Sequence, residues 1–179
     1  MGDRSQFRLL GERRFSPFFW TQFLGAFNDN VLKNGLVTLL AFQSTRLSAE
    51  TSNQLIFLSG AIFILPFFLF SATAGQIADK YEKSRLIRFV KQFEIAVMTI
   101  GAAGFLMDNL PLLFFALFLM GLHSTAFGPI KYAILPQHLR EDELVGGNAL
   151  VDSGMFIAIL LGTILGILLV GQGAIGREL

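Results

Sequence analysis

The chain has 179 residues, of which 53% are hydrophobic and 15% are charged, with 20 phenylalanines and no cysteine. A soluble domain of this length does not normally hide so much apolar surface, so the composition favours a membrane protein. The absence of cysteine excludes disulfides and thiolate metal sites, and the net charge of +1 gives no reason to expect a nucleic-acid or acidic partner. We therefore expect neither a metal ion nor another cofactor.

The first 17 residues predict a basic cytoplasmic tail. They contain four arginines but no short apolar core followed by a small-residue cleavage site, so they do not resemble a signal peptide. Five apolar stretches follow, each long enough to cross a bilayer as a helix, which takes about 20 residues. The sequence predicts these spans at residues 18–42, 55–78, 86–107, 110–135 and 144–170. Strands are disfavoured because the stretches lack period-two alternation, so the predicted fold class is an all-α membrane protein.

Polar residues lie near the middle of the first stretch, with apolar residues on either side. They are Asn28, Asp29, Asn30, Lys33 and Asn34. A charge at the bilayer centre costs about 2.5–3.5 kcal/mol on insertion scales, so these side chains must face protein or water. Asp29 and Lys33 are four residues apart and can simply neutralise each other. The three asparagines favour the alternative, a polar cavity that water reaches.

Basic residues concentrate between the second and third stretches. They are Lys80, Lys83, Arg85, Arg88 and Lys91, whereas the turns after the first and third stretches share a single arginine. Short cytoplasmic loops hold an excess of Lys and Arg, so the N-terminus is predicted to lie inside and residues 171–179 to form a short outer tail. In the third stretch Glu94 follows Lys91 by three residues, a spacing that suits a local ion pair.

The fourth stretch supplies a second polar set, His123, Ser124 and Lys131. Counting ~1.5 Å per residue from the cytoplasmic end places Asp29 and His123 at similar depths of about 18 Å, with Lys131 shallower. Lys131 can reach inward toward Asp29 or snorkel to the interface. His123 suits either a hydrogen bond between helices or proton transfer. A cavity shared by Asp29, Lys33 and Lys131 would carry a formal charge of +1 and would suit a ligand with a phosphate or carboxylate.

Small residues recur every four positions along the fifth stretch. Gly154, Ala158, Gly162 and Gly166 form one stripe that lets another helix approach closely. That helix can be an earlier one of this chain or one outside it. Because five is an odd number of spans, we expect the chain to be the N-terminal portion of a longer bundle, truncated within residues 171–179.

The turn after the second stretch carries a recognisable motif. Its sequence, Gly75-Gln76-Ile77-Ala78-Asp79-Lys80-Tyr81-Glu82-Lys83-Ser84-Arg85, resembles the signature loop of the major facilitator superfamily. The resemblance implies a gating loop that latches the cytoplasmic side shut, with Gly75, Asp79, Lys80, Lys83 and Arg85 as its residues. Glu82 and Ser84 depart from the usual glycine and basic residue, which implies an altered latch unless Arg85 substitutes. The alternative is a basic anchor at the inner membrane surface.

A narrower resemblance covers most of the chain. Residues 15–30 (FSPFFWTQFLGAFNDN) and 127–136 (FGPIKYAILP), with Asn148 and the region of Gly162 and Gly166, are similar to the lysophospholipid transporter branch of that superfamily. The resemblance implies a twelve-helix fold in the bacterial inner membrane and inward movement of lysophospholipid. Members of this branch occur alone or fused to acyltransferase and acyl carrier protein synthetase domains. The implied partners are the lysophospholipid or another amphipathic substrate, membrane lipids, and missing helices or a fused acyltransferase module.

Three functions compete on this evidence. The leading one is transport by alternating access, with a polar headgroup site formed by Asn28, Asp29, Asn30, Lys33, His123 and Lys131, for lysophospholipid or another anionic or amphipathic solute. The second is a lipid enzyme in which His138 deprotonates a hydroxyl, with Glu143 in the place where acyltransferases have an aspartate. No accompanying motif supports that reading, so we expect no enzyme. The third is a truncated, non-transporting subunit.

Overall fold

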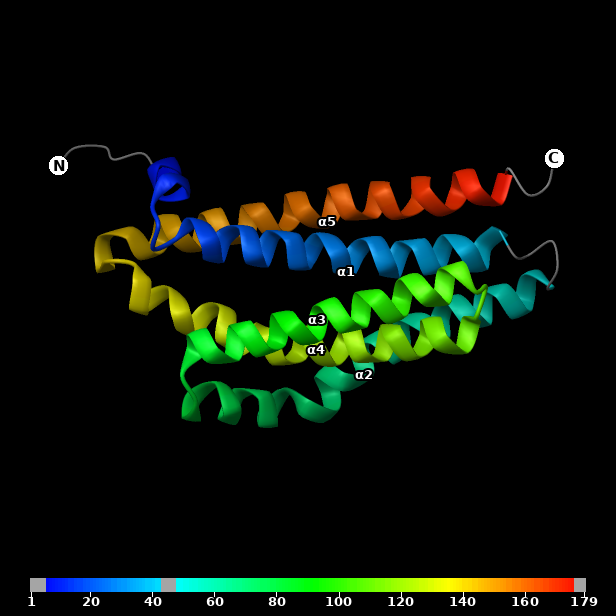
Figure 1. Cartoon of the computed structure of the whole chain (residues 1–179), viewed down its shortest axis with the longest axis horizontal. Coiled ribbons are helices and arrows are strands. Elements are labelled where there is room, and N and C mark those ends of the chain that lie inside the picture. The colour runs from blue at the N-terminus through cyan, green and yellow to red at the C-terminus, as the bar shows by residue number, and fades with distance from the viewer. Residues whose placement is uncertain (1–5, 43–47, 176–179) are drawn as a thin grey trace.

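The computed structural model describes residues 6–42 and 48–175, with the side chains described through residue 172. The five long helices are α1 (Ser16–Phe42), α2 (Ala49–Lys80), α3 (Lys83–Leu106), α4 (Leu110–His138) and α5 (Leu144–Ile175). Two short 3-10 helices accompany them, η1 (Gln6–Gly11) within the predicted tail and η3 (Glu141–Glu143) before α5. No strand occurs in the described ranges. The five helices run alongside one another and follow the long axis of the molecule (Figure 1).

Four of the described helices are long and apolar enough to cross a membrane: α2, α3, α4 and the stretch Glu141–Gln172 that contains α5. The predicted class, an all-α membrane protein, is therefore confirmed. The helix α1 has 27 residues but is not among these four, so a count of five spans remains a prediction. The second helix begins at Ala49, earlier than predicted, because the Ser48 hydroxyl caps it by accepting the Thr51 N–H at 3.2 Å.

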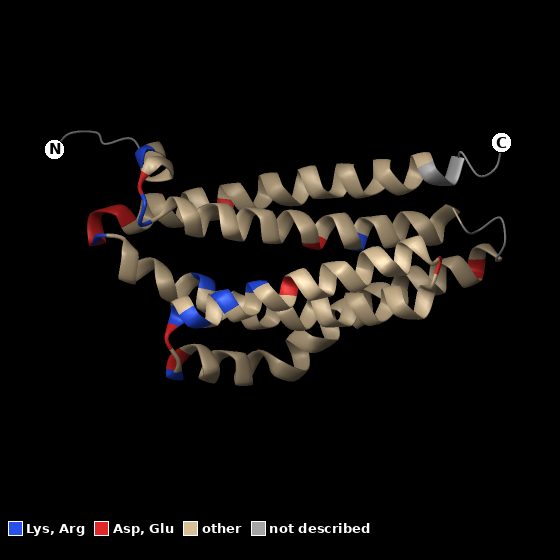
Figure 2. Ribbon diagram, in the orientation of Figure 1, with Lys and Arg blue, Asp and Glu red and all other residues tan. Residues whose placement is uncertain are grey.

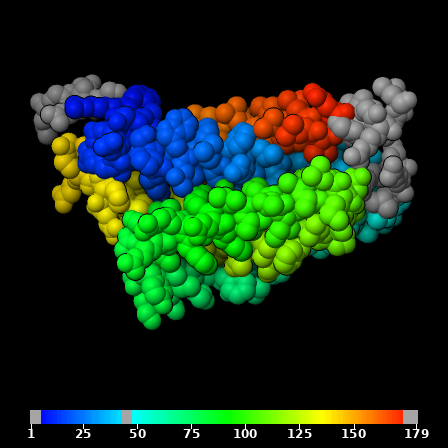
Figure 3. Space-filling model, viewed as in Figure 1, coloured from blue at the N-terminus to red at the C-terminus, as the bar shows by residue number. Residues whose placement is uncertain are grey.

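The bundle has two parts. The helices α1 and α5 lie side by side, and α4 packs against both α2 and α3 (Figure 1). The space-filling view shows α1 and α3 meeting along one face (Figure 3). A buried apolar cluster joins α1, α3 and α4 through residues such as Leu36, Val97 and Leu117. A second cluster around Phe15 and Val151 joins the start of α1 to α5. The two apolar clusters therefore lie toward opposite ends of the bundle, and the polar residues in the middle of α1 lie between the clusters.

The small-residue stripe of α5 packs against α1. A Cβ at Gly162 would collide with the Phe27 carbonyl oxygen, and one at Gly166 would lie 2.6 Å from the Val31 carbonyl oxygen. Ala158, one turn before Gly162 on the same stripe, is completely buried. The partner of the stripe is therefore an earlier helix of this chain, the first of the two predicted alternatives.

Lys and Arg residues gather at the end of the bundle that holds η1, the turn between α2 and α3, and the turn between α4 and α5 (Figure 2). Four of these basic residues, Lys83, Arg85, Arg88 and Lys91, lie on the first turns of α3. Because successive helices alternate in direction, one end of the bundle collects all three segments. This arrangement suits the predicted cytoplasmic side, which remains a prediction.

The turn between α2 and α3 is much shorter than the predicted loop. The helix α2 continues through Lys80, and α3 begins at Lys83, so only Tyr81 and Glu82 lie between them. Gly75 and Asp79 belong to the last turns of α2, and Arg85 to the first turn of α3. The predicted connection of residues 79–85 is therefore corrected to two helix ends and a tight turn, while the gating role of these residues remains a prediction.

Glu82 has a structural role at this turn. Its carboxylate accepts the backbone N–H groups of Ser84 at 2.9 Å and Arg85 at 2.8 Å, and so caps α3. These hydrogen bonds hold the pKa of the Glu82 carboxyl below its ordinary value. Glu82, one of the two residues that depart from the motif, therefore caps the start of the third helix.

We expect Glu82→Ala to speed hydrogen exchange of the Ser84 and Arg85 amides several-fold at neutral pH, because both lose their acceptor. A lowered folded-state pKa stabilises the cap above the unfolded pKa of about 4.3, and this stabilisation is lost as the pH falls through the folded value. The native and variant rates, measured by mass spectrometry, should therefore converge in acid. Asp79→Ala, on the other side of the turn, is the matched control. Equal rates at neutral pH would contradict the capping role.

Candidate functional site

Asp29, at the middle of α1, faces α4. Its Oδ2 accepts the Ser124 hydroxyl at 2.7 Å, while its Oδ1 is buried and has no hydrogen-bond partner among the described residues. This hydrogen bond places Asp29 level with the His123–Ser124 pair, as the predicted depths required. An unpaired carboxylate oxygen in a buried position is costly unless a ligand, water or proton satisfies it.

Glu94 of α3 lies at the centre of the same cluster. Its carboxylate accepts the Asn28 amide at 3.3 Å and the Lys91 ammonium at 2.5 Å, and its Oε2 lies 3.2 Å from His123 Nε2. The residue is only 5% exposed. The sequence interpretation of Glu94 as a local partner of Lys91 was correct but incomplete, because it missed the contacts with α1 and α4. The missed signal was an acidic residue inside an apolar helix.

Phe127 and Gly25 complete the packing around this cluster. The Phe127 ring stacks on His123 at a centroid distance of 6.2 Å, and Lys91 Nζ lies 4.5 Å from its centroid. An ammonium over an aromatic face is attracted by the ring quadrupole. On α1, a Cβ at position 25 would collide with Lys91 Nζ. Glycine at this position therefore lets the lysine approach the helix.

Lys33 and Lys131 do not join Asp29. Lys33 Nζ lies over the Phe63 ring of α2 at 5.5 Å, and the described contacts contain no ion pair between Lys33 and Asp29. Lys131 is buried and points toward α5, with its Nζ 3.4 Å from the Met155 sulfur. Both outcomes considered for Lys131, reaching Asp29 or snorkelling outward, are thus wrong. The expected shared cavity of charge +1 is not formed, because the side chains leave α1 and α4 in different directions.

Two of the predicted asparagines, Asn30 and Asn34, form hydrogen bonds within α1 or to α5. Asn30 donates to the Ala26 carbonyl at 2.8 Å and is buried. Asn34 donates to the Asn30 carbonyl at 2.9 Å and to the Thr163 hydroxyl of α5 at 3.0 Å. Of the predicted headgroup residues, the structure therefore brings together Asn28, Asp29 and His123, and it adds Glu94 and Lys91.

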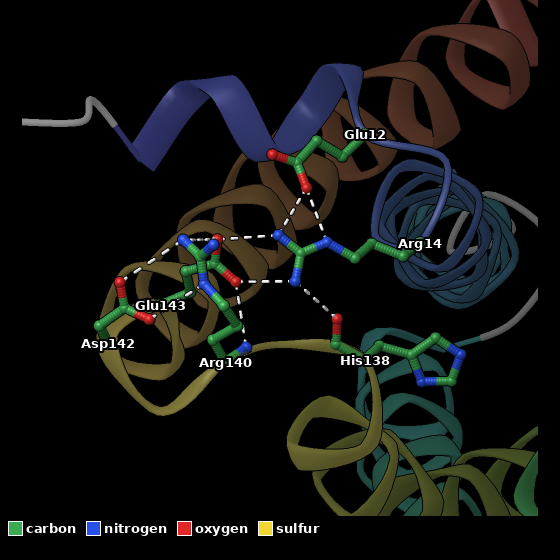
Figure 4. Close-up of polar contacts among 6 residues, drawn as sticks. All are labelled: Glu12, Arg14, His138, Arg140, Asp142 and Glu143. Carbon is green, nitrogen blue, oxygen red and sulfur yellow. Dashed lines mark hydrogen bonds and ion pairs between the residues drawn. The ribbon is translucent and has the colours of Figure 1, made fainter.

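A second charged cluster lies at the end of the bundle that holds η1 (Figure 4). The Arg14 guanidinium donates to both Glu143 oxygens at 2.8 Å, to Glu12 at 2.7 Å and to the His138 carbonyl at 3.1 Å. Arg140 pairs with Glu143 and Asp142. These partners raise the pKa of Arg14, with the Glu143 hydrogen bond as the main cause. The cluster ties the start of α1 to the turn between α4 and α5.

This geometry does not form the His138–Glu143 pair of the enzyme hypothesis. The His138 ring lies away from Glu143 in Figure 4, and its Nδ1 contacts the Ile134 carbonyl at 3.2 Å. Both Glu143 oxygens are occupied by arginines. The carboxylate is therefore not available to orient His138 as a general base.

We expect Arg14→Gln to loosen the start of α1, because Glu143 then keeps Arg140 as its only arginine partner among the described residues. Hydrogen exchange should rise several-fold at the amides of residues 14–19 and 139–143. Arg13→Gln removes the same charge from an exposed neighbour and is expected to leave exchange unchanged. If both variants behave alike, net charge rather than the specific ion cluster controls this end.

No protein-family model and no solved structure matches the chain. Over 145 residues it is 34% identical to proteins named Lysophospholipid transporter LplT from Salmonella heidelberg (strain SL476), Salmonella newport (strain SL254) and Salmonella typhi. The matched residues make up 81% of this chain but 33% of each relative, so the chain spans about a third of the length of these curated relatives. It is a multi-pass, all-α membrane protein that is similar, over most of its own length, to proteins named as transporters.

Proposed function

We propose that this chain is the N-terminal part of a major facilitator-type transporter that moves lysophospholipid inward across the bacterial inner membrane by alternating access. The observation that carries the proposal is the 34% identity with named lysophospholipid transporters over 145 residues. The helical bundle supports it, since a membrane span places Asp29 and Glu94 where only a ligand path, water or another charge justifies them. The N-terminus then lies in the cytoplasm, on the side of the basic helix ends.

The proposed headgroup site is centred on Asp29 and includes Asn28, Lys33 and His123. Asp29 Oδ1 has no described hydrogen-bond partner and is the atom best placed to accept a donor from a headgroup. Lys33 is the nearest cation along the same helix, and its side chain rests on Phe63 rather than in an ion pair. On α1, Lys33 can thus contact the phosphate of a headgroup while Asp29 contacts its ammonium group.

The turn between α2 and α3 is the proposed cytoplasmic gate. Asp79, Lys80 and Arg85 are exposed at this end, and Asp79 forms no ion pair with another described residue. Their charges are therefore available for contacts with helices outside the described residues, including any helix that packs near Gly75. A carboxylate near helix N-termini and cations forms contacts that break when two bundles rock apart. We further propose that uptake requires helices in addition to these five.

A hybrid transporter tests this function. The chain replaces the matching third of one of the Salmonella relatives, and uptake of labelled lysophosphatidylethanolamine is measured in vesicles from cells without their own transporter. The hybrid is expected to restore uptake, whereas the relative with that third deleted is not. In a second arm, a photoactivatable lysophosphatidylethanolamine should label this chain alone in nanodiscs and be displaced by unlabelled lipid. Failure of both arms with normally inserted protein would overturn the proposal.

A further inference from the structure

The outer face of α3 is exposed, while its inner face packs against α4 and α1. The exposed positions recur every three or four residues and are Arg85, Arg88, Phe89, Gln92, Ile95, Ala96 and Thr99. This spacing places them on one side of the helix. In Figure 3, α3 lies at the front of the molecule, and no other described helix covers it there. This side of α3 is therefore open to the surrounding bilayer.

The end of this face next to the α2–α3 turn carries unbalanced positive charge (Figure 2). Four basic side chains here form no ion pair with any described residue: Lys80, Lys83, Arg85 and Arg88. The two acidic residues between positions 79 and 88 are Asp79 and Glu82, so positive charges exceed negative ones by two. The Glu82 carboxylate is held by the backbone N–H groups that it caps.

Two of these cations are arranged to share one anion. Arg85 and Arg88 are three residues apart on the same face of α3, a spacing at which like charges repel each other unless an anion lies between them. Arg88 Nε donates to the Ser84 carbonyl at 3.3 Å, which holds the guanidinium close to the helix. Its terminal nitrogens have no hydrogen-bond partner among the described residues. A guanidinium can bind two oxygens of one phosphate at once, so this pair suits a phosphate group.

Aromatic residues indicate that this end of α3 lies at the level of lipid headgroups. The only tryptophan and both tyrosines of the chain, Trp20, Tyr81 and Tyr132, lie toward this end of the bundle and are about half exposed. Tryptophan and tyrosine prefer the membrane–water interface. Arg88 follows Tyr81 by seven residues, or about 10 Å along a helix, a distance from which an arginine can extend its charge to the headgroups.

We propose that Arg85 and Arg88 bind the phosphate of an anionic bilayer phospholipid, whose acyl chains lie along Phe89 and Ile95. Phe89 is 69% exposed and Ile95 is 68% exposed, so both offer apolar surface on the same side of the helix. The excess positive charge favours an anionic headgroup over a zwitterionic one. This site is on the outside of the bundle, whereas Asp29 faces α4 on the inside. Lipid binding here does not depend on the proposed transport.

Binding of two phospholipids to the complete chain tests the site. The chain in detergent micelles is titrated with phosphatidylglycerol or phosphatidylethanolamine, and native mass spectrometry measures the fraction of protein that carries lipid. We expect tighter binding of phosphatidylglycerol. Arg88→Gln should weaken it about fivefold, and Arg85→Gln with Arg88→Gln about thirtyfold, given the usual contribution of each arginine at an anionic lipid surface. Arg88 is not part of the proposed gate, so its single variant tests lipid binding alone.

The matched control is the double variant Arg8→Gln and Arg13→Gln. It removes the same charge from two exposed arginines at the same end of the bundle and should retain native phosphatidylglycerol binding. Inorganic phosphate should not displace the lipid, because it makes no contact with Phe89 or Ile95. Equal affinity for both lipids in the native chain would overturn the proposal. So would unchanged binding in the α3 double variant, an equal loss in the control, or displacement by inorganic phosphate.

Discussion

Asp29→Asn is expected to reduce lysophospholipid uptake by the hybrid transporter about tenfold or more, since a hydrogen bond to a charged group contributes about 1.5–3 kcal/mol. Asparagine keeps the size of the side chain and can still accept the Ser124 hydroxyl through its amide oxygen. It removes the negative charge and replaces Oδ1, the buried oxygen that lacks a described partner, with an amide donor. The variant therefore tests the charge at the proposed headgroup site rather than the packing of α1.

The matched control for this experiment is Asp152→Asn. Asp152 lies on α5 and accepts a hydrogen bond from Tyr132 on an exposed part of the bundle. Its replacement removes the same charge and is expected to leave uptake near the native level. Initial uptake rates are compared at equal amounts of inserted protein. Native uptake by the Asp29 variant would remove Asp29 from the proposed site, while an equal loss in both variants would point to a general effect of charge.

The second large effect is expected at Gly162. Gly162→Ala places a methyl group against the Phe27 carbonyl oxygen, and neither backbone can move without separating α1 from α5. Overpacking of this kind typically costs about 1–3 kcal/mol. The free energy of unfolding should fall by that amount in mixed detergent micelles, where added denaturing detergent unfolds the chain.

Gly60→Ala is the matched control, because a Cβ at position 60 of α2 meets no described atom within 4 Å. The same substitution there brings only the better helix propensity of alanine, which amounts to at most about 1 kcal/mol of stabilisation. The two variants should therefore change stability in opposite directions. A Gly162 variant as stable as the native chain would show that α1 and α5 are not held at this distance.

Composition and hydrophobic length were enough to predict the fold class. Apolar stretches of this length must satisfy their backbone groups internally in lipid, and helices do so without partners. The gating turn shows the limit of that reasoning. The predicted spans ended at residue 78 and resumed at residue 86, but α2 continues through Lys80 and α3 begins at Lys83 because Glu82 supplies the cap. The side chain of one residue shortened the connection.

The sequence alone determined where polar residues enter the bundle and which face of α5 is small, because both follow from positions along one helix. Asp29 and the stripe containing Gly162 were identified in this way. Only the tertiary structure decided which polar groups meet. Lys131 turned to Met155, whereas Glu94 became the common partner of Asn28 and His123. Such partnerships depend on the rotation of each helix about its axis, which is set by packing between α1, α3 and α4 and not by spacing within any one of them.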